Sequence, residues 1–271
     1  MNAGTGGVIA RLEHSGGTIT LFGSLIATEL VSMTGTAQLR VRGSGDLIGD
    51  VLVWAGAALT VEGALTGGLG SFGSVTVSGM IDGAVQSHGA LALNGGLVTG
   101  LLSVAAGTVT ASAGAVFGAG IAMTGGNVTL TGATVQGDIA LGAGHDELVL
   151  ETGTVAGAVS GGAGHDWSVS LIGVSGAPQG INGGNGQDTI EGGSLADLFR
   201  GGNGNDLLHG GGGHDSFYGD AGNDTLIGDD VTSYANPGQN ADRLFGGAGN
   251  DLLFGGARAD RLSGGTENDA L

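Results

Sequence analysis

The sequence predicts an all-β fold with a turn every few residues. Three observations predict it: 63 of the 271 residues are glycine, apolar and polar residues alternate in short stretches, and the C-terminal third carries a nine-residue repeat. Glycine inside a helix costs roughly 0.5–1 kcal/mol relative to alanine, so this composition disfavours helices. Because 41% of the residues are hydrophobic and only 12% are charged, the chain has apolar surface to bury, which argues against disorder.

Charge and composition exclude several classes of protein. The formal net charge is −18, all seven basic residues are arginine, and cysteine is absent. Without cysteine the chain has no disulfide framework and no thiolate metal site or nucleophile. An acidic chain without lysine is not a general nucleic-acid binder, which neutralises phosphates with cations. Neither a secretory signal peptide nor an apolar stretch of membrane-spanning length is recognisable, so we expect no membrane span.

The first 180 residues contain a loose repeat of short apolar stretches. Stretches such as LTVEGALTGGL (59–69) and VTVSGMIDGAV (75–85) place two apolar pairs around a small-residue turn, and successive stretches begin 16 to 21 residues apart. Alternation of this kind is typical of strands with one buried face. Two architectures satisfy it: a parallel solenoid, in which each coil buries its face against its neighbours, and an antiparallel sandwich.

The C-terminal third carries a repeat in a fixed frame. Aspartate recurs every nine residues, preceded by a pair of glycines and followed two residues later by a large apolar side chain, as in GGNGQDTIE (183–191) and GGAGNDLLF (246–254). In ten consecutive frames only Ser233 replaces the aspartate. The framed aspartates are Asp188, Asp197, Asp206, Asp215, Asp224, Asp242, Asp251, Asp260 and Asp269.

This pattern resembles the RTX calcium-binding nonapeptide GGxGxDxUx, in which U is apolar. The resemblance is close over residues 183–271 and looser at LGAGHDELV (141–149) and GGAGHDWSV (161–169). It implies several bound Ca²⁺ ions, because glycine turns can aim carbonyl oxygens at one point and aspartate adds an anionic oxygen, and calcium prefers such hard donors. Besides the framed aspartates, the expected ligands are Asp146, Asp166, Gly183, Gly201, Gly210, Gly219 and Gly246.

The resemblance also implies a parallel β-roll, in which two nonapeptides form one coil of 18 residues and the turns stack along two edges. One predicted edge carries Asp188, Asp206, Asp224, Asp242 and Asp260, and the other carries Asp197, Asp215, Asp251 and Asp269. On this prediction the segment 228–236 is a degenerate turn with a gap at Ser233, and not an insertion. Substitutions at glycine positions are expected to weaken single sites, namely Leu195, Asp220, Pro237, Arg258 and Glu267.

A coil of this length matches the period of the first 180 residues. The simplest architecture is therefore one parallel β-solenoid, residues 1–180, that continues into a calcium-binding RTX β-roll, residues 181–271. Like charges along the roll would repel one another without a counter-ion, so we expect the roll to order on calcium binding.

Catalytic signals are weak in this sequence. The motifs HExxH and GxSxG are absent. We interpret the acids Asp46, Asp50 and Asp82 as solvated turn residues. Three histidines that precede turn aspartates are interpreted as solvent-facing turn residues rather than transition-metal ligands, namely His145, His165 and His214.

The resemblance implies a function as well as a fold. It implies secretion by a bacterial type I system, folding outside the cell where calcium is abundant, and a structural, surface-layer or adhesive role. The expected partners are calcium ions, with self-association and cell-surface or polysaccharide contacts as further expectations, and no nucleic acid. Two alternatives remain open: a polysaccharide-modifying enzyme module of the lyase or epimerase type, and a virion or filament component.

Overall fold

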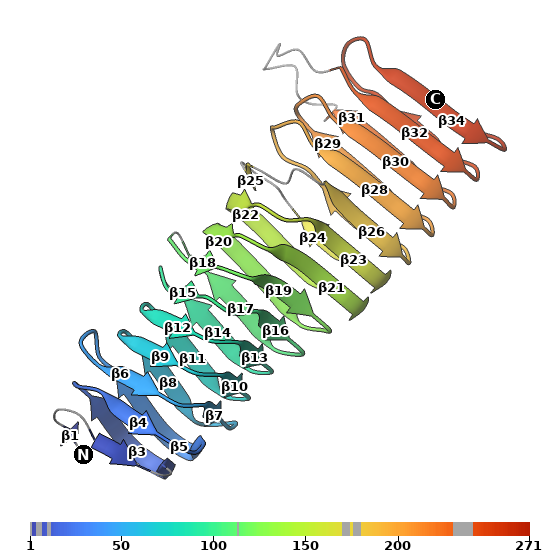
Figure 1. The fold of residues 1–271 in the computed structure, drawn as a ribbon. Helices are drawn as coiled ribbons and strands as arrows, with labels where there is room; N and C mark the ends of the chain where they lie inside the picture. Colours follow the sequence, from blue (N-terminus) through green and yellow to red (C-terminus); the bar gives the residue numbers. More distant parts are fainter. Residues whose placement is uncertain are drawn as a thin grey trace. The chain divides into compact units, whose positions relative to one another are not determined.

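The regular elements are all β-strands in the computed structural model (Figure 1), which describes residues 2–3, 7–9, 12–112, 114–169, 174–175, 180–229 and 241–271. The strands pair in parallel with strands one coil away, for example Leu47 with Leu65 and Phe199 with Phe217. The predicted all-β parallel solenoid is confirmed, and the antiparallel sandwich is wrong. None of the described segments forms a helix with the length and apolarity of a membrane span.

The chain divides into two compact units, each built of stacked coils. The N-terminal unit comprises Met1–Ala122 and Gly126–Gly137, and the C-terminal unit comprises Met123–Gly125 and Asp138–Leu271. The boundary at residue 180 that the sequence predicts separates two types of repeat, the loose repeat and the nonapeptide repeat. This boundary stays a prediction.

Each coil of the N-terminal unit contributes a strand to each of three stacks. The first stack contains β2 (Gly7–Ile9), β4 (Leu25–Ala27), β6 (Asp46–Ile48), β9 (Ala64–Thr66), β12 (Met80–Asp82), β15 (Leu97–Val98) and β18 (Val116–Phe117). The second contains the start of β5 (Val31–Val41), then β7 (Val51–Val53), β10 (Leu69–Ser71), β13 (Val85–Ser87), β16 (Leu102–Val104) and β19 (Gly120–Met123). The third contains β1 (Asn2–Ala3), β3 (Leu12–Leu21), the end of β5, β8 (Ala58–Val61), β11 (Ser74–Val77), β14 (Ala90–Leu93), β17 (Thr108–Ala111) and β20 (Asn127–Val135).

Apolar side chains form ladders inside these coils. Alternate residues point inward because side chains alternate across a strand, so Leu65, Ile81 and Phe117 are fully buried one above another. Each coil buries its apolar face against the next, and the narrow turns between strands are filled by small residues. The core of the N-terminal unit therefore runs along the axis of the stack.

The C-terminal unit has two main stacks. One contains β21 (Asp138–Gly144), β23 (Val159–Gly164), β26 (Ile181–Asn185), β28 (Leu198–Asn203), β30 (Ser216–Ala221), β32 (Arg243–Ala248) and β34 (Arg261–Thr266). The other contains β22 (Glu147–Val155), β24 (Trp167–Val169), β27 (Thr189–Glu191), β29 (Leu207–Gly211), β31 (Thr225–Asp229) and β33 (Leu252–Phe254), and β25 (Val174–Ser175) also pairs with β22. The apolar position of the repeat forms the core, where Phe199 and Phe217 stack with ring centroids 5.0 Å apart.

One coil of this unit is longer than the others. Phe199 pairs with Phe217, 18 positions along the chain (199 to 217), whereas Phe217 pairs with Leu244, 27 positions along (217 to 244). The other stack shows the same spacing of 27 positions between the paired residues Leu226 and Leu253 (226 to 253). Nine residues are therefore inserted in this coil, and the prediction of a degenerate turn without an insertion is wrong. Ser233 and Pro237 lie outside the described residues.

Candidate metal centre

The turns of the C-terminal unit depend on left-handed backbone conformations. The second and fourth motif positions have positive φ, as at Gly202 (φ 114°) and Gly204 (φ 134°), where glycine avoids a Cβ clash. Three of the substituted positions keep this backbone: φ is 71° at Asp220, 100° at Arg258 and 79° at Glu267. These three departures add local strain without changing the turn, whereas Leu195 does not have a positive φ, so its turn differs from the others.

The framed aspartates form two ladders, each joined by hydrogen bonds from one coil to the next. In every step the backbone N–H of one aspartate donates to Oδ1 of the aspartate in the following coil, over 2.8 to 3.2 Å. The first ladder consists of Asp146, Asp166, Asp188, Asp206, Asp224, Asp251 and Asp269. The second ladder consists of Asp197, Asp215, Asp242 and Asp260.

The insertion exchanges the two predicted edges. Asp224 is followed in its ladder by Asp251 and not by Asp242, and Asp242 follows Asp215. The predicted stacking of Asp224 on Asp242 is therefore wrong. Nine additional residues move every later turn to the opposite edge, because each coil holds two turns that are nine residues apart.

The second oxygen of most ladder carboxylates has no partner, whereas Asp197 Oδ2 accepts the Gly193 N–H at 3.2 Å. Both carboxylate oxygens of Asp146 are buried without a hydrogen bond. In seven other aspartates Oδ2 alone is buried without one, namely Asp166, Asp188, Asp206, Asp215, Asp224, Asp242 and Asp251. These side chains are at most 4% exposed. A buried charged oxygen without a partner is costly, so each of these atoms fits a bound cation.

A backbone carbonyl lies beside each of these Oδ2 atoms except that of Asp146. A Cβ placed on Gly201 would lie 2.3 Å from Asp206 Oδ2 and 2.8 Å from the carbonyl oxygen of Gly219 in the next coil. Both oxygens therefore converge on one small space, which the missing side chain leaves open. The other predicted glycines, Gly183, Gly210, Gly219 and Gly246, have the same two neighbours: the Oδ2 of the aspartate five residues on and a carbonyl of the next coil.

The sequence analysis missed further glycines of this kind. Gly161 and Gly192 have the same pair of neighbours, and their position at the start of the motif was a sufficient signal. Gly228 is different, because its neighbour is Asp242 Oδ2 at 2.4 Å, 14 positions away (228 to 242) instead of five. The inserted residues lie between these two, so the spacing in the sequence concealed the pair.

Burial raises the pKa of the ladder carboxyls. Removal from water is the main cause that raises the pKa of Asp206 and Asp215 to about 7; a backbone hydrogen bond to each carboxylate opposes this shift, and the charges of neighbouring aspartates add to it. The same cause raises the pKa of Asp224 and Asp242 to about 6. Without a cation, the ladders therefore resist full ionisation near neutral pH.

The set of donors fits calcium better than a transition metal. Among the described residues no three His, Asp or Glu side chains gather as a metal cluster, and the polar neighbours of the ladder Oδ2 atoms are backbone carbonyl oxygens. Carbonyl and carboxylate oxygens suit Ca²⁺, whereas imidazole suits zinc, copper and nickel. The rings of His145 and His165 stack 5.1 Å apart, and His214 Nδ1 accepts the Ala241 N–H at 2.9 Å, so these side chains contribute to coil stacking.

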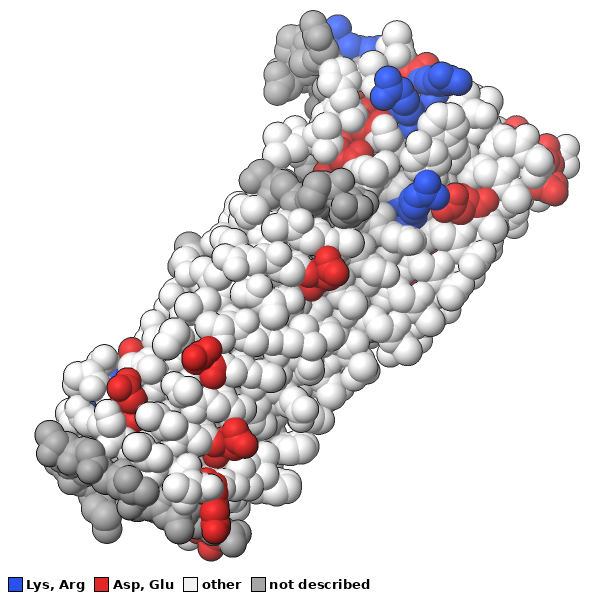
Figure 2. All heavy atoms as spheres, in the orientation of Figure 1, with Lys and Arg blue, Asp and Glu red and all other residues white. Residues whose placement is uncertain are grey.

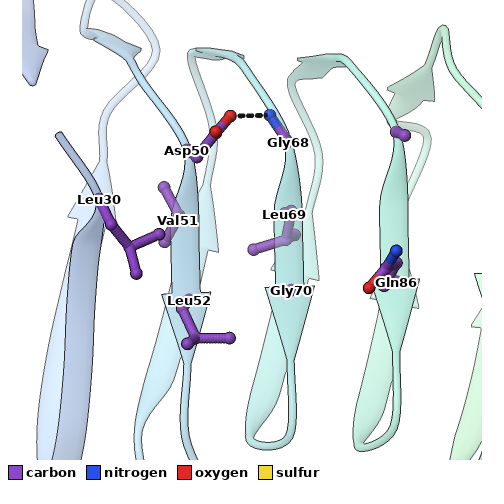
Figure 3. A pocket seen from close by; sticks show the side chains of 9 residues that line it. Leu30, Asp50, Val51, Leu52, Gly68, Leu69, Gly70 and Gln86 are labelled. Atoms are coloured by element: carbon purple, nitrogen blue, oxygen red, sulfur yellow. Dashed lines mark hydrogen bonds between the residues drawn. The ribbon is translucent and has the colours of Figure 1, made fainter. Parts of the chain in front are cut away.

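The acids of the N-terminal unit also join neighbouring coils. Asp50 Oδ1 accepts the Gly68 N–H at 2.7 Å beside a hollow of about 250 Å³ (Figure 3), and Asp82 Oδ1 accepts the Thr99 hydroxyl at 2.7 Å. Asp46 Oδ2 lies 3.4 Å from the Ser24 hydroxyl. The hollow lies over Gly70, which presents no side chain between Leu52 and Gln86. These contacts give the three acids a role in coil stacking.

Comparison with known families agrees with this geometry. A family model described as the RTX calcium-binding nonapeptide repeat, in four copies, matches residues 181–199, 191–226 and 237–271. No curated protein and no solved structure matches the chain. The matched residues contain the framed aspartates and the converging glycine carbonyls described above. The C-terminal part of the chain, residues 181–271, is therefore built of RTX calcium-binding nonapeptide repeats.

Proposed function

We propose that this chain is a calcium-dependent structural protein whose C-terminal unit folds when calcium ions bind along both aspartate ladders. The observation that carries this proposal is the row of buried Oδ2 atoms without a partner, each beside a glycine carbonyl of the next coil except at Asp146. Bound calcium would neutralise the carboxylates and satisfy the carbonyl oxygens at once. Binding to the folded form alone would then stabilise that form by mass action.

The proposed ligands extend beyond the residues that the family model matches. Asp146 and Asp166 belong to the first ladder, and Asp166 Oδ2 lies 2.8 Å from the Cβ position of Gly161, with the carbonyl of Gly183 on the same side. This is the arrangement found around Asp206. We therefore include both aspartates among the calcium ligands, one to two coils before residue 181.

A calcium titration of the full chain tests the folding proposal. We expect the β-sheet circular dichroism signal to be reduced in a chelator, to recover as calcium is added, and to recover much less with magnesium, which demands octahedral geometry and retains its waters. A spectrum that is the same in chelator and in calcium would contradict the proposal. Isothermal titration calorimetry of the same samples gives the number of ions.

The proposed location is outside a bacterial cell, after secretion by a type I system. RTX repeats are typical of secreted bacterial proteins. Extracellular calcium modules bind their ion at roughly 10⁻⁴–10⁻³ M, so such a chain would stay unfolded during export and fold outside. The proposed role there is a surface-layer, adhesive or matrix component. Fractionation of the source cells tests it: recovery of the protein only from the cytoplasm would refute this location.

A further inference from the structure

An arginine-rich surface lies on the outer side of the sheet formed by β28, β30, β32 and β34. We call it the arginine face, and it consists of Arg200, Tyr218, Arg243, Phe245 and Arg261. The three arginines are exposed, and the arginines of this region gather toward the C-terminal strands in Figure 2. A chain with a formal net charge of −18 contains only seven arginines, so three on one sheet face are a marked concentration of positive charge.

The aromatic rings and two of the guanidinium groups form one continuous stack. The Arg200 guanidinium lies 4.7 Å from the centre of the Tyr218 ring, and the Tyr218 and Phe245 rings are 5.1 Å apart and nearly parallel. Arg261 covers the other side of Phe245 at 5.9 Å. Stacking occupies the faces of the guanidinium groups and leaves their in-plane N–H donors directed outward for bidentate bonds to a carboxylate, although Arg200 Nη1 already donates to Asp220.

The charges of the arginine face are incompletely neutralised within the chain. Arg200 pairs with Asp220 at 3.3 Å, but both side chains are exposed, and such pairs contribute little stability. Arg243 and Arg261 occupy directly paired positions on β32 and β34, and among the described residues no acid lies within ion-pair distance of either. Like charges directly opposite each other destabilise a sheet, so fold stability does not account for them.

We propose that the arginine face binds an acidic polysaccharide through the carboxylates on its sugar rings. Adjacent strands lie about 4.8 Å apart, so the three strand steps from Arg200 to Arg261 place guanidinium groups over roughly 14 Å of a nearly flat surface. A flat row of separated donors suits a linear chain with repeated carboxylates better than a small molecule, which needs a concave pocket. Three arginines are too few for nucleic acid, which requires many cations over a long contact.

This proposal rests on calcium-dependent folding, because the face exists only when the four strands are stacked. Polysaccharide binding should therefore require calcium even though none of the arginines is a proposed calcium ligand. The dependence also gives a way to separate the two proposals. If the chain showed no calcium-induced β signal, the folding proposal would be wrong. If the chain folded with calcium but bound no acidic polysaccharide, only the polysaccharide proposal would be wrong.

The test uses the full chain in calcium and hyaluronan oligosaccharides, which carry carboxylates and do not gel with calcium. We expect binding by calorimetry that weakens at least tenfold in the double variant Arg243→Gln/Arg261→Gln and that falls with added salt. Arg40→Gln is the matched control, because Arg40 is an exposed arginine of the N-terminal unit that pairs with Glu62. The affinity of this variant for hyaluronan should stay within twofold of that of the unmodified chain. The calcium-induced circular dichroism signal confirms that each variant folds.

Two further ligands decide the chemistry. Chondroitin sulfate should bind at least as well as hyaluronan, because sulfate groups add anionic oxygens in the same geometry, and neutral dextran should not bind. Equal binding of dextran, or equal hyaluronan affinity of the folded double variant and the unmodified chain, would overturn the proposal. Binding only to vesicles of anionic phospholipid, with none to hyaluronan or chondroitin sulfate, would overturn it as well.

Discussion

The two oxygens of each ladder aspartate have different surroundings. In Asp206, Oδ1 accepts the Asp188 N–H at 2.9 Å, whereas Oδ2 is buried without a partner. The first oxygen therefore holds two coils together, and the second is available to a cation. One side chain thus links the stacking of the coils to the binding of the metal.

Replacement of Asp206 by asparagine separates these two roles. The amide oxygen can still accept the Asp188 N–H, but the charge is lost, so we expect the calcium concentration at the folding midpoint to rise about tenfold, equivalent to about 1.4 kcal/mol. In chelator the variant should be at least as ordered as the unmodified chain, because a buried charge has been removed. Circular dichroism during a calcium titration measures both effects.

The control for this substitution is Asp46→Asn. Asp46 is an exposed acid of the N-terminal unit, and its carboxylate contacts only the Ser24 hydroxyl among the contacts described above. The midpoint should not change. If Asp206→Asn also left the midpoint unchanged, Asp206 would not be a calcium ligand.

Gly201 provides a second prediction at the scale of one residue. A methyl group at this position would lie 2.3 Å from Asp206 Oδ2, in the space where the carboxylate and a carbonyl converge. We expect Gly201→Ala to destabilise the calcium-bound form by about 1–3 kcal/mol, as overpacking does. Gly43→Ala is the matched control, because nothing lies within 4 Å of its Cβ position. Thermal unfolding in calcium tests the pair, and equal melting temperatures would contradict the prediction.

At the scale of elements, the strand ladders decide how the turns stack. The apolar side chains of β30 and β32 pair Phe217 with Leu244, although the two lie 27 positions apart (217 to 244). The additional residues lie between Gly228 and Asp242 in the sequence, and Asp242 Oδ2 still lies 2.4 Å from the Cβ position of Gly228. The core ladder therefore keeps its spacing despite the insertion.

Removal of nine residues between Asp229 and Asp242 tests this register. The deletion would place Gly228 five positions before Asp242, the spacing of Gly201 and Asp206, so both ladders would keep their partners. We expect the deletion variant to fold in calcium with a midpoint within about twofold of the unmodified chain, because the closure entropy of a connection depends only weakly on its length. Circular dichroism and thermal unfolding measure this.

A deletion of four residues from the same segment is the comparison. It would leave the connection at a length that is not a whole repeat, and the turn could not present Gly228 and Asp242 to each other with the motif spacing. We expect weaker calcium-induced folding than in the nine-residue deletion. If the two deletions behaved alike, the inserted length would have no relation to the repeat.

At the scale of the whole molecule, the acidic ladders make the stability of the metal-free chain depend on pH. Burial raises the pKa of Asp206 and Asp215 from 3.8 to about 7 in the folded chain. The folded form then binds protons between about pH 4 and pH 7 that the unfolded chain has already released, so its stability falls as pH rises through this window. The metal-free chain should be more ordered at pH 5 than at pH 7.5.

Calcium should reverse this dependence. Protons compete with calcium for the same oxygens, so the calcium concentration at the folding midpoint should be higher at pH 5 than at pH 7.5. Circular dichroism at both pH values, in chelator and during a calcium titration, tests both statements. A chelated chain that loses β signal on acidification to pH 5 would show that the ladder carboxyls are not buried as described.

The sequence by itself determined the local features of this protein. Glycines at fixed positions specify left-handed turns, an apolar residue after each aspartate specifies a short strand with one buried side chain, and the aspartates specify a row of hard oxygen donors. Because these properties depend on residues within one nonapeptide, the all-β class, the parallel solenoid and the ligand types could be predicted. The framed aspartates form hydrogen-bonded ladders, which Asp146 and Asp166 extend, but the last four exchange edges relative to the prediction.

Only the tertiary structure decided which residues meet across coils. Asp224 stacks on Asp251 because the apolar ladder from Leu226 to Leu253 skips nine residues, and both alternatives fit the same nine-residue frame. The arginine face likewise joins Arg200 to Arg261 across four strands, residues that share no local motif. Stacking in a solenoid is a contact between coils, so its register is set by how the cores of neighbouring coils pack, and that packing is not encoded within a single repeat.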